Sequence, residues 1–341
     1  MKISKIMVAT ALVMVMAIMA GCGSSKKAAT NNGGAEQKVT LKMATQLAAT
    51  HPLVKAMDTF KQKVEEKTKG SVTIQIYPAG QLFNDKTMND ALMSGGIDLG
   101  LNTVGRWASI IPAMDIFDVP FLFPTYESVS KAIDSGLGEK LGAELEKKGV
   151  KPIIWADYGF VEIANNIKEV KKPSDLAGLK IRGYSKYSTE TIKALGASSV
   201  TMGSGEVYMG IQRGTIDGQI SGPSAMRDRK MYEVHKYMTI TNNASPEFIL
   251  AMNDKSYGKL SEAQKKAVTE AAKEVQDMIR KNAKQEDMSS IETLKEKGMV
   301  IYQIPENELP EWQNATKSVW DDFIKENGTV GQALIDICTK K

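Results

Sequence analysis

An arginine at the end of a short apolar segment is the residue of this sequence with the clearest chemistry. Leu179–Ile181 has the composition of a buried strand, and Arg182 follows it directly. In parallel α/β sheets, ligands lie at the carboxyl ends of the strands. A guanidinium group there can hold a carboxylate through two parallel hydrogen bonds. From the residues alone, an ion pair on the protein surface is the alternative and the more common role.

Polar and aromatic side chains follow two predicted strands in the first half of the chain. Gln46 and His51 follow one strand, where they can contact a ligand or serve only a turn and a helix cap. Asn102 and Trp107 follow the other strand. Trp107 can stack on an apolar or ring-bearing ligand, or it can be buried as the anchor of its loop. These four residues are candidates for a ligand site, and Gln46, His51 and Trp107 each have a structural alternative.

Two stretches of the chain share a strand, helix, strand, helix, strand pattern that would position these residues. The first pattern is predicted at Val39–Met43, Leu53–Lys67, Val72–Ile76, Lys86–Met93 and Ile97–Leu101. The second is predicted at Leu179–Ile181, Tyr187–Leu195, Ser199–Met202, Gly205–Gln212 and Ile216–Ile220. Such alternation predicts a parallel α/β sheet. Two copies of the unit indicate two similar lobes with a cleft between them.

Two predicted connections between the lobes indicate a hinge. The chain changes direction at Asp157–Phe160 and returns through a strand at Ile240–Asn253. Ser261 to about Lys295 has a single apolar face, and such a helix would run roughly 50 Å at 1.5 Å per residue. A helix of that length would lie along both lobes. Two crossings favour closure of the lobes around a ligand.

The first residues have the features of a bacterial export signal. Lys2 and Lys5 precede Ile6–Ala20, an uncharged and mostly apolar run that is shorter than the roughly 20 residues of a membrane span. Small residues then precede Cys22, as in a lipoprotein signal, where the cysteine is lipidated. An ordinary secretory signal with an incidental cysteine is the alternative. We expect residues 1–21 to be a signal peptide that leaves the protein lipid-anchored outside the cytoplasm.

The remaining chain divides into a tether and two lobes. Residues 22–37 are rich in Gly, Ser, Asn and Ala, which predicts a flexible tether. We expect the first lobe to contain residues 38–159 and 247–285. The second lobe is expected to contain residues 160–246 and 286–341.

Composition argues against several classes of function. The formal net charge is +4, and no arginine-rich cluster indicates nucleic acid as a partner. With two histidines, and with Cys338 as the one cysteine left free by lipidation, neither a metal site nor a cofactor is expected. The sequence lacks a phosphate loop, a nucleophile elbow and a His-Glu-x-x-His helix, so an enzyme is not expected. Membrane contact is expected through the lipid anchor only, because no later apolar run reaches membrane length.

Several motifs together resemble one family of transport proteins. They are YPAGQL, GGIDLGL, VPFLF, PSDLAGLKIR, LGASSVTM, GEVYMGIQRGTIDGQ and YEVHKYMTIT, and the resemblance extends from about Val39 to Ile324. From these motifs the chain is similar to the DctP-like substrate-binding proteins of TRAP transporters. The resemblance implies a two-lobe periplasmic-binding-protein fold, class II-like, with hinge crossings and a long helix along both lobes. It also implies capture of a small organic acid and its delivery to DctQ-like and DctM-like membrane subunits.

The resemblance also implies roles for particular residues. The arginine of the KIR segment, Arg182 here, binds the ligand carboxylate in this family. Sialic-acid-type members carry a second arginine where this chain has Glu162, which would face a ligand amine or hydroxyl, repel a second carboxylate, or lie exposed on a strand. Tyr184, Ser204 and Ser221 are further candidates for ligand contact. With Trp107, the ring of Tyr184 and the small Ser204 would suit a bulkier, aromatic or branched monocarboxylate.

A second transport function shares the same fold and anchor. A solute-binding lipoprotein of an ATP-driven transporter, or of a sensor system, would have two lobes, a hinge and a lipidated cysteine as well. Physical features of the sequence do not separate the two functions, and only the family motifs favour a TRAP transporter.

Overall fold

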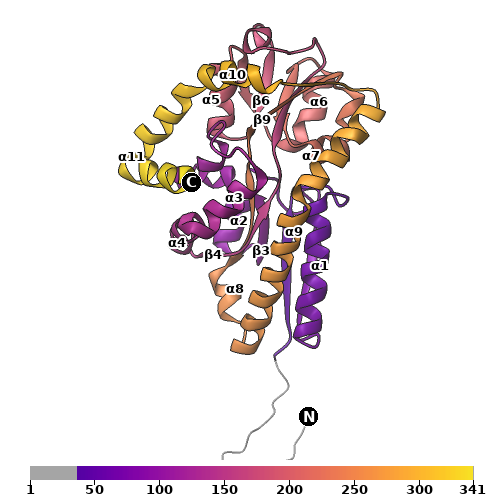
Figure 1. Ribbon diagram of the computed structural model, residues 1–341. Coiled ribbons are helices and arrows are strands. Elements are labelled where there is room, and N and C mark those ends of the chain that lie inside the picture. Colours follow the sequence, from indigo (N-terminus) through magenta and orange to yellow (C-terminus); the bar gives the residue numbers. More distant parts are fainter. Residues whose placement is uncertain (1–36, 341) are drawn as a thin grey trace, which may run out of the picture. The chain divides into compact units, whose positions relative to one another are not determined.

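A computed structural model describes residues 37–340 of the chain. Within this range the chain forms two β-sheets covered by helices, an α/β fold (Figure 1). We call the five-stranded sheet with its helices the first lobe and the six-stranded sheet with its helices the second lobe. The predicted signal peptide, the predicted lipidation site Cys22 and nearly all of the predicted tether lie outside the described residues.

The first lobe is built on a mixed sheet. Its strands, in spatial order, are β2 (Val72–Tyr77), β1 (Val39–Thr45), β3 (Leu99–Thr103), β10 (Glu247–Asn253) and β4 (Val150–Asp157). Strand β1 is parallel to β2 and β3, while β10 is antiparallel to β3 and β4. Because β1 and β3 are parallel, the loops after them leave from the same edge of the sheet.

The second lobe is built on a second mixed sheet with the same local order. Its strands, in spatial order, are β11 (Val300–Gln303), β9 (Tyr237–Ala244), β5 (Val161–Asn165), β8 (Gly218–Ser221), β6 (Lys180–Gly183) and β7 (Ser198–Thr201). Strand β6 is parallel to β7 and β8, and β5 is antiparallel to β8 and β9. The two β-α-β-α-β units predicted from the sequence therefore lie in different sheets.

Helices connect the strands and close both lobes. They are α1 (Pro52–Lys67), α2 (Met88–Ser94), α3 (Tyr126–Ala132), α4 (Gly138–Glu146), α5 (Lys186–Ala194), α6 (Val207–Gln212), α7 (Pro223–Asp228), α8 (Asp254–Gly258), α9 (Glu262–Glu296), α10 (Leu309–Ala315) and α11 (Lys317–Thr339). Two short 3-10 helices, η1 (Val104–Trp107) and η2 (Pro112–Asp118), follow β3. No helix within residues 37–340 combines the length and the apolar character needed to cross a membrane.

The long helix α9 joins the two lobes. Its 35 residues begin at a capping box in which Ser261 accepts a hydrogen bond from the Gln264 N–H. It packs against α1 and β4 of the first lobe and continues to α7 of the second, as Figure 1 shows. Buried small residues such as Ala271 and Ala272 allow this close approach. The predicted helix along both lobes is confirmed.

The chain crosses between the lobes at two adjacent strand connections. Strand β4 leads to β5 through Gly159, which has a φ of 96°, and β9 leads to β10 through Ser245 and Pro246. Helix α9 stabilises the first crossing, because Asp287 accepts a hydrogen bond of 2.9 Å from the Phe160 N–H. The tyrosine hydroxyl of Tyr126 donates a second bond of 2.8 Å to the same carboxylate.

Helix α11 contacts both lobes, which concerns the predicted lobe boundaries. Its buried Val319, Phe323, Leu334 and Ile335 join the apolar cluster beneath η2 and α3 of the first lobe. It also contacts α5 of the second lobe, where Phe323 packs against Tyr187. Within the predicted second-lobe segment 286–341, α11 thus contacts both lobes while β11 lies in the second sheet, and the domain boundaries stay a prediction.

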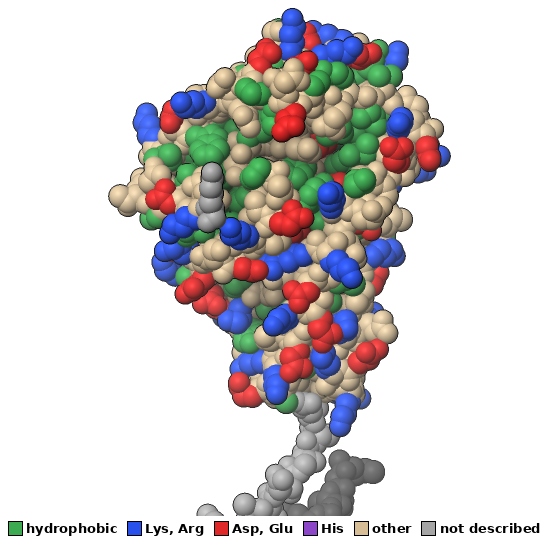
Figure 2. Space-filling view, in the orientation of Figure 1, with side chains coloured by type: hydrophobic (Ala, Val, Ile, Leu, Met, Phe, Trp, Pro, Cys, Tyr) green, Lys and Arg blue, Asp and Glu red, His purple; other side chains and the backbone are tan. Residues whose placement is uncertain are grey.

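The surface carries charges of both signs. On the face shown in Figure 2, lysine and arginine side chains are interspersed with aspartate and glutamate, and apolar side chains lie between them. Several form ion pairs across elements, such as Lys63 with Glu274 at 2.5 Å. Pairs of this kind on exposed helices contribute little to stability.

Substitution of Gly159 tests the geometry of the first crossing. A Cβ atom there would lie 2.2 Å from Oδ2 of Asp287, in addition to the strain of a positive φ. We expect Gly159→Ala to lower the free energy of unfolding, measured by urea denaturation. Gly178→Ala is the matched control, because Gly178 has a φ of 85° and no neighbour within 4 Å. The loss should exceed that of the control by about 1–3 kcal/mol, and equal losses would contradict the packing.

Candidate functional site

A small cavity lies where the ends of the strands of both lobes meet. The residues that line it come from strand ends, from the crossings and from nearby loops: Gln46, Asp85, Thr103, Tyr158, Val161, Arg182, Tyr184, Ser204, Ser221, Gly222, Pro246 and Phe248. Its volume is about 30 Å³, which is close to that of one water molecule. The pocket between the lobes thus combines polar and apolar side chains and has little free space.

Arg182 lies on the second-lobe side of this cavity with its guanidinium group buried. The side chain is 2% exposed, and its Nε donates to the carbonyl oxygen of Met202 at 3.0 Å. Its two terminal nitrogens donate to the carbonyl oxygen of Ile220 at 3.4 Å and to the hydroxyl of Ser204 at 3.1 Å. Within the described residues these three acceptors are all neutral, so none of them compensates the positive charge.

Two more arginines approach the same cavity. Arg106, from η1, forms an ion pair of 2.7 Å with Asp85 and also donates to the Met202 carbonyl at 3.4 Å. Arg229 follows α7 and donates to the carbonyl oxygen of Ser204 at 2.6 Å. It also donates to the backbone and side-chain oxygens of Gln46. These hydrogen bonds connect the second lobe to the first. Positive groups therefore outnumber the one carboxylate that lines the cavity.

The charges of these groups shift one another's pKa values. Burial, with repulsion from Arg106, lowers the pKa of Arg182 to about 10, and the group stays cationic at neutral pH. Burial alone would raise the pKa of Asp85, but the neighbouring Arg106 and Arg182 hold it below its ordinary value. Asp85 is therefore ionised and already shared between two cations. An incoming anion would find positive potential here.

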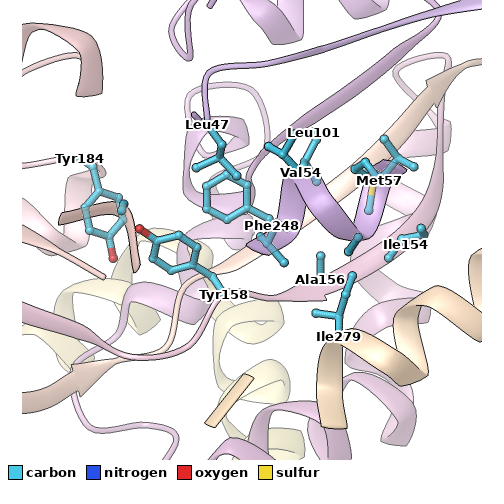
Figure 3. Close-up of a cluster of buried hydrophobic side chains, with 14 of the residues drawn as sticks. Leu47, Val54, Met57, Leu101, Ile154, Ala156, Tyr158, Tyr184, Phe248 and Ile279 are labelled. Atoms are coloured by element: carbon cyan, nitrogen blue, oxygen red, sulfur yellow. The ribbon is translucent and has the colours of Figure 1, made fainter. Parts of the chain in front are cut away.

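Aromatic rings form one wall of the cavity. The ring of Tyr158 stacks on Phe248 with centroids 4.9 Å apart and on His51 with centroids 5.6 Å apart. Figure 3 shows the Tyr158 hydroxyl directed toward Tyr184, whose ring lies 5.6 Å from the Arg182 guanidinium carbon. Gly222 allows this packing, because a Cβ there would lie 2.4 Å from the Tyr158 ring. The wall can cover an apolar part of a ligand.

Five of the nine predicted ligand-contact residues line the cavity, and they are Arg182, Gln46, Tyr184, Ser204 and Ser221. They come together because the carboxyl ends of the strands in each lobe open toward the junction of the lobes. The other four, His51, Asn102, Trp107 and Glu162, are buried beside or behind the cavity without lining it.

Each of these four residues has structural contacts of its own. The Nδ1 atom of His51 accepts a bond from the Leu53 N–H and caps α1, while burial lowers the pKa of His51 to about 3. The amide of Asn102 donates to the backbone carbonyl of Asp85 at 3.0 Å and thereby helps to position that residue. Trp107 is 1% exposed and packs in the apolar core of the first lobe.

Glu162 holds the strand that leads into the second crossing. Its Oε2 atom accepts hydrogen bonds from the backbone N–H groups of Thr241 at 2.5 Å and Asn242 at 3.1 Å. The pairing of β5 with β9 is irregular at this point, between Val161 and Ile163. Burial raises the pKa of Glu162 to about 8, although these N–H groups oppose the shift.

Sequence reasoning missed Asp85, Arg106 and Arg229. Arg106 lies in the segment after β3 that the sequence marked for its position, and Arg229 follows the third strand of the second repeat in the same way. Their positions after predicted strands could have marked both arginines as candidates for the ligand site. Asp85 lies in a loop ahead of α2 and had no such signal.

A family model described as "Bacterial extracellular solute-binding protein, family 7" (DctP) matches residues 43–327. The chain belongs to this family. DctP-family members are substrate-binding receptors of TRAP transporters, so this chain is a solute-binding protein and not an enzyme. The matched range includes the cavity and all three arginines.

Relatives and solved structures agree with this assignment. The 2,3-diketo-L-gulonate-binding periplasmic protein YiaO of Escherichia coli (strain K12) is 30% identical over 71% of this chain and 74% of its own length. A TRAP periplasmic solute binding protein from Sulfurospirillum deleyianum with bound succinate has 27% identity and a TM-score of 0.84, covering 89% of this chain and 100% of its own. The sugar acid binding protein DctPAm from Advenella mimigardefordensis, in complex with galactonate, has 25% identity and a TM-score of 0.85, covering 89% and 98%.

The two-lobe fold expected from the DctP-like motifs is confirmed by these likenesses. The strand and helix arrangement described above is thus that of TRAP periplasmic solute-binding proteins.

The buried carboxyl group of Glu162 should make stability depend on pH. Its pKa in the folded protein, about 8, lies above the ordinary value of 4.5, so the folded state binds the proton more tightly. Its contribution is therefore fully present below about pH 4.5 and is lost as the pH rises to about 8. We expect Glu162→Gln to remove this part of the decline in unfolding free energy between pH 5 and pH 8.

Urea denaturation at several pH values measures this effect. Glu169→Gln is the matched control, because Glu169 is exposed, and it should leave the profile of the parent protein unchanged. If both variants declined as steeply as the parent, Glu162 would not be the titrating group.

Proposed function

We propose that this protein captures a small organic acid between its two lobes, with the carboxylate of the ligand held by Arg182. The observation that carries the proposal is the buried guanidinium group, whose three hydrogen bonds all go to neutral acceptors. A buried charge without a counter-charge is costly. A ligand carboxylate would supply the compensation that Asp85, already paired with Arg106, supplies only in part.

The hydrogen-bonding capacity of Arg182 is compatible with this role. A guanidinium group has five N–H donors, and three of them have the acceptors described above. The remaining donors can bind a carboxylate, and Ser204 and Ser221 add hydroxyl groups on the same wall. Tyr158 and Phe248 would cover the carbon skeleton of the ligand.

The related proteins support a small organic acid as the class of ligand. They bind 2,3-diketo-L-gulonate, succinate and galactonate, which differ in size and in hydroxyl groups but all carry a carboxylate. We therefore assign a small organic acid as the ligand class. A bulkier monocarboxylate stays our proposal for the ligand itself, on the strength of the aromatic wall and the small Ser204.

Ligand entry requires the lobes to separate. A cavity of about 30 Å³ is too small for any of these acids, since typical ligand pockets have about 300–1,000 Å³. The two adjacent crossings at Gly159 and Pro246 are the places where backbone rotation would open the cleft. The direct contacts between the lobes, such as that of Arg229 with Gln46, would break on opening and re-form around the ligand.

The proposed cellular role follows from the family and from the start of the sequence. The protein would be anchored outside the cytoplasmic membrane by lipid on Cys22, and would deliver its ligand to the DctQ-like and DctM-like subunits of a TRAP transporter. The substitution Cys22→Ser should then shift the protein from the membrane fraction to the soluble fraction. Unchanged membrane association would contradict the anchor.

A thermal-shift screen with organic acids tests the proposed ligand class. Succinate, galactonate and branched or aromatic monocarboxylates are the probes, because a ligand that binds only the folded state raises the midpoint of unfolding. We expect at least one acid to raise the midpoint, and Arg182→Ala to weaken its binding by about 2–5 kcal/mol. Calorimetric titration gives the dissociation constants.

The matched control is Arg213→Ala, since Arg213 is an exposed arginine at the end of α6. It should bind the same acid with the affinity of the parent protein. An Arg182→Ala variant with unchanged affinity would overturn the assignment of Arg182, and the absence of any shift across the screen would count against the ligand class.

A further inference from the structure

Two buried carboxyl groups lie side by side at the junction of the lobes. Asp115 and Asp118, both in η2, are 0% and 1% exposed and lie within hydrogen-bonding reach of each other. The hydroxyl of Ser185 lies within hydrogen-bonding reach of both carboxyl groups, and its single hydrogen can serve only one of them at a time. Oδ1 of Asp115 and Oδ2 of Asp118 lie next to Gly105, 3.0 and 2.4 Å from the position that a Cβ would occupy there. Two ionised carboxylates in this arrangement would repel strongly, so the pair must hold a proton.

The groups that cover this pair come from the other lobe. The hydroxyl of Tyr184 donates to Oδ1 of Asp118 at 2.5 Å, and the backbone N–H of Tyr187 donates to Oδ2 of Asp115 at 3.3 Å. Both belong to the segment that directly follows β6, the strand that carries Arg182. The acid pair is therefore enclosed by the same segment that supplies the proposed carboxylate-binding group.

Other charged groups near the pair are few and already have partners. Arg106, from η1, favours the ionised form of Asp118 but forms its ion pair with Asp85. On α5, Lys186 pairs with Glu326 of α11 at 2.6 Å, and Glu326 also accepts a bond of 2.5 Å from the Tyr187 hydroxyl. Asp322 of α11 adds a further negative charge near Tyr187. No cation among these groups is paired directly with Asp115 or Asp118, so a proton remains their natural counter-charge.

We propose that the Asp115–Asp118 pair couples closure of the lobes to the uptake of one proton from water. The inference rests on the proposed opening of the cleft, because separation of the lobes would expose to solvent a pair that is buried in this structure. In the closed state, Tyr184 and Tyr187 exclude water from the two carboxyl groups. In the open state, both would be hydrated, and the shared proton would return to solvent.

The sign of the effect follows from the burial. Burial and the neighbouring carboxylate raise the pKa of Asp115 well above its ordinary value of 3.8, and burial raises that of Asp118. The closed state therefore binds the proton more tightly than the open state. Above the ordinary carboxyl range, the ratio of closed to open protein should fall by up to about tenfold per pH unit, until the pH exceeds the pKa of the closed pair. Acid favours closure and base favours opening.

Distances between spin labels on the two lobes test this coupling without any ligand. Labels at exposed positions Asp90 on α2 and Lys193 on α5 would report on the separation, with Cys22 and Cys338 replaced by serine. Pulsed electron paramagnetic resonance between pH 5 and pH 8 should show a short-distance population that decreases as the pH rises. A distribution that does not change with pH would overturn the proposal.

Variants of the pair identify the titrating groups. Asp118→Asn keeps the shape and supplies an amide hydrogen in place of the proton, so the short-distance population should persist to pH 8. Asp115→Asn should do the same, and it serves if the first variant fails to fold. Asp98→Asn is the matched control, because Asp98 bonds to Lys42 and Ser256 within the first lobe, and it should retain the pH dependence.

The outcomes separate this inference from the proposed function. If both Asn variants kept the pH dependence of the parent, the acid pair would not be its source and the proposal would fall. If the labels responded as expected but no organic acid bound in the thermal-shift screen, the ligand class would be wrong and the proton coupling would stand.

Discussion

The structure of the site depends on one constraint, which is that a buried guanidinium group needs a compensating charge. Arg182 is 2% exposed, and its three hydrogen bonds within the described residues go to neutral acceptors. The hydroxyl of Ser204 and the carbonyl of Met202 satisfy part of its hydrogen bonding, and Asp85 lowers the local potential without pairing directly. The fold thus holds a cation in a dry position at the junction of two lobes, where an anion gains the most from binding.

Much of the fold was predictable from local patterns, because the two β-α-β-α-β units have clear strands, glycine-ended helices and matching order. Arg182, Gln46 and Ser221 were placed at one cavity for the same reason, since the ends of parallel strands in a sheet open at one edge. The long helix α9 was visible as a single apolar face. These features depend on residues that are close together in the sequence, so local patterns are enough to predict them.

The rest depended on contacts between distant segments. Glu162 was expected to face a ligand or solvent, yet its carboxyl group accepts backbone bonds from Thr241 and Asn242, about 80 residues away in sequence. Arg106 and Arg229 resemble any surface arginine until the lobes bring them together. Whether a charged side chain points toward the cavity depends on how the lobes pack together. No local sequence pattern predicts this.

The origin of the three arginines has a mechanical consequence. Arg106 belongs to one lobe and Arg182 and Arg229 to the other, so drawing the halves together also concentrates like charge. In the proposed transport cycle, an anionic cargo would relieve this repulsion at the moment of docking. The ligand-bound and ligand-free proteins would then differ in shape. A membrane partner that recognises the shape of the closed protein could distinguish the one with bound ligand.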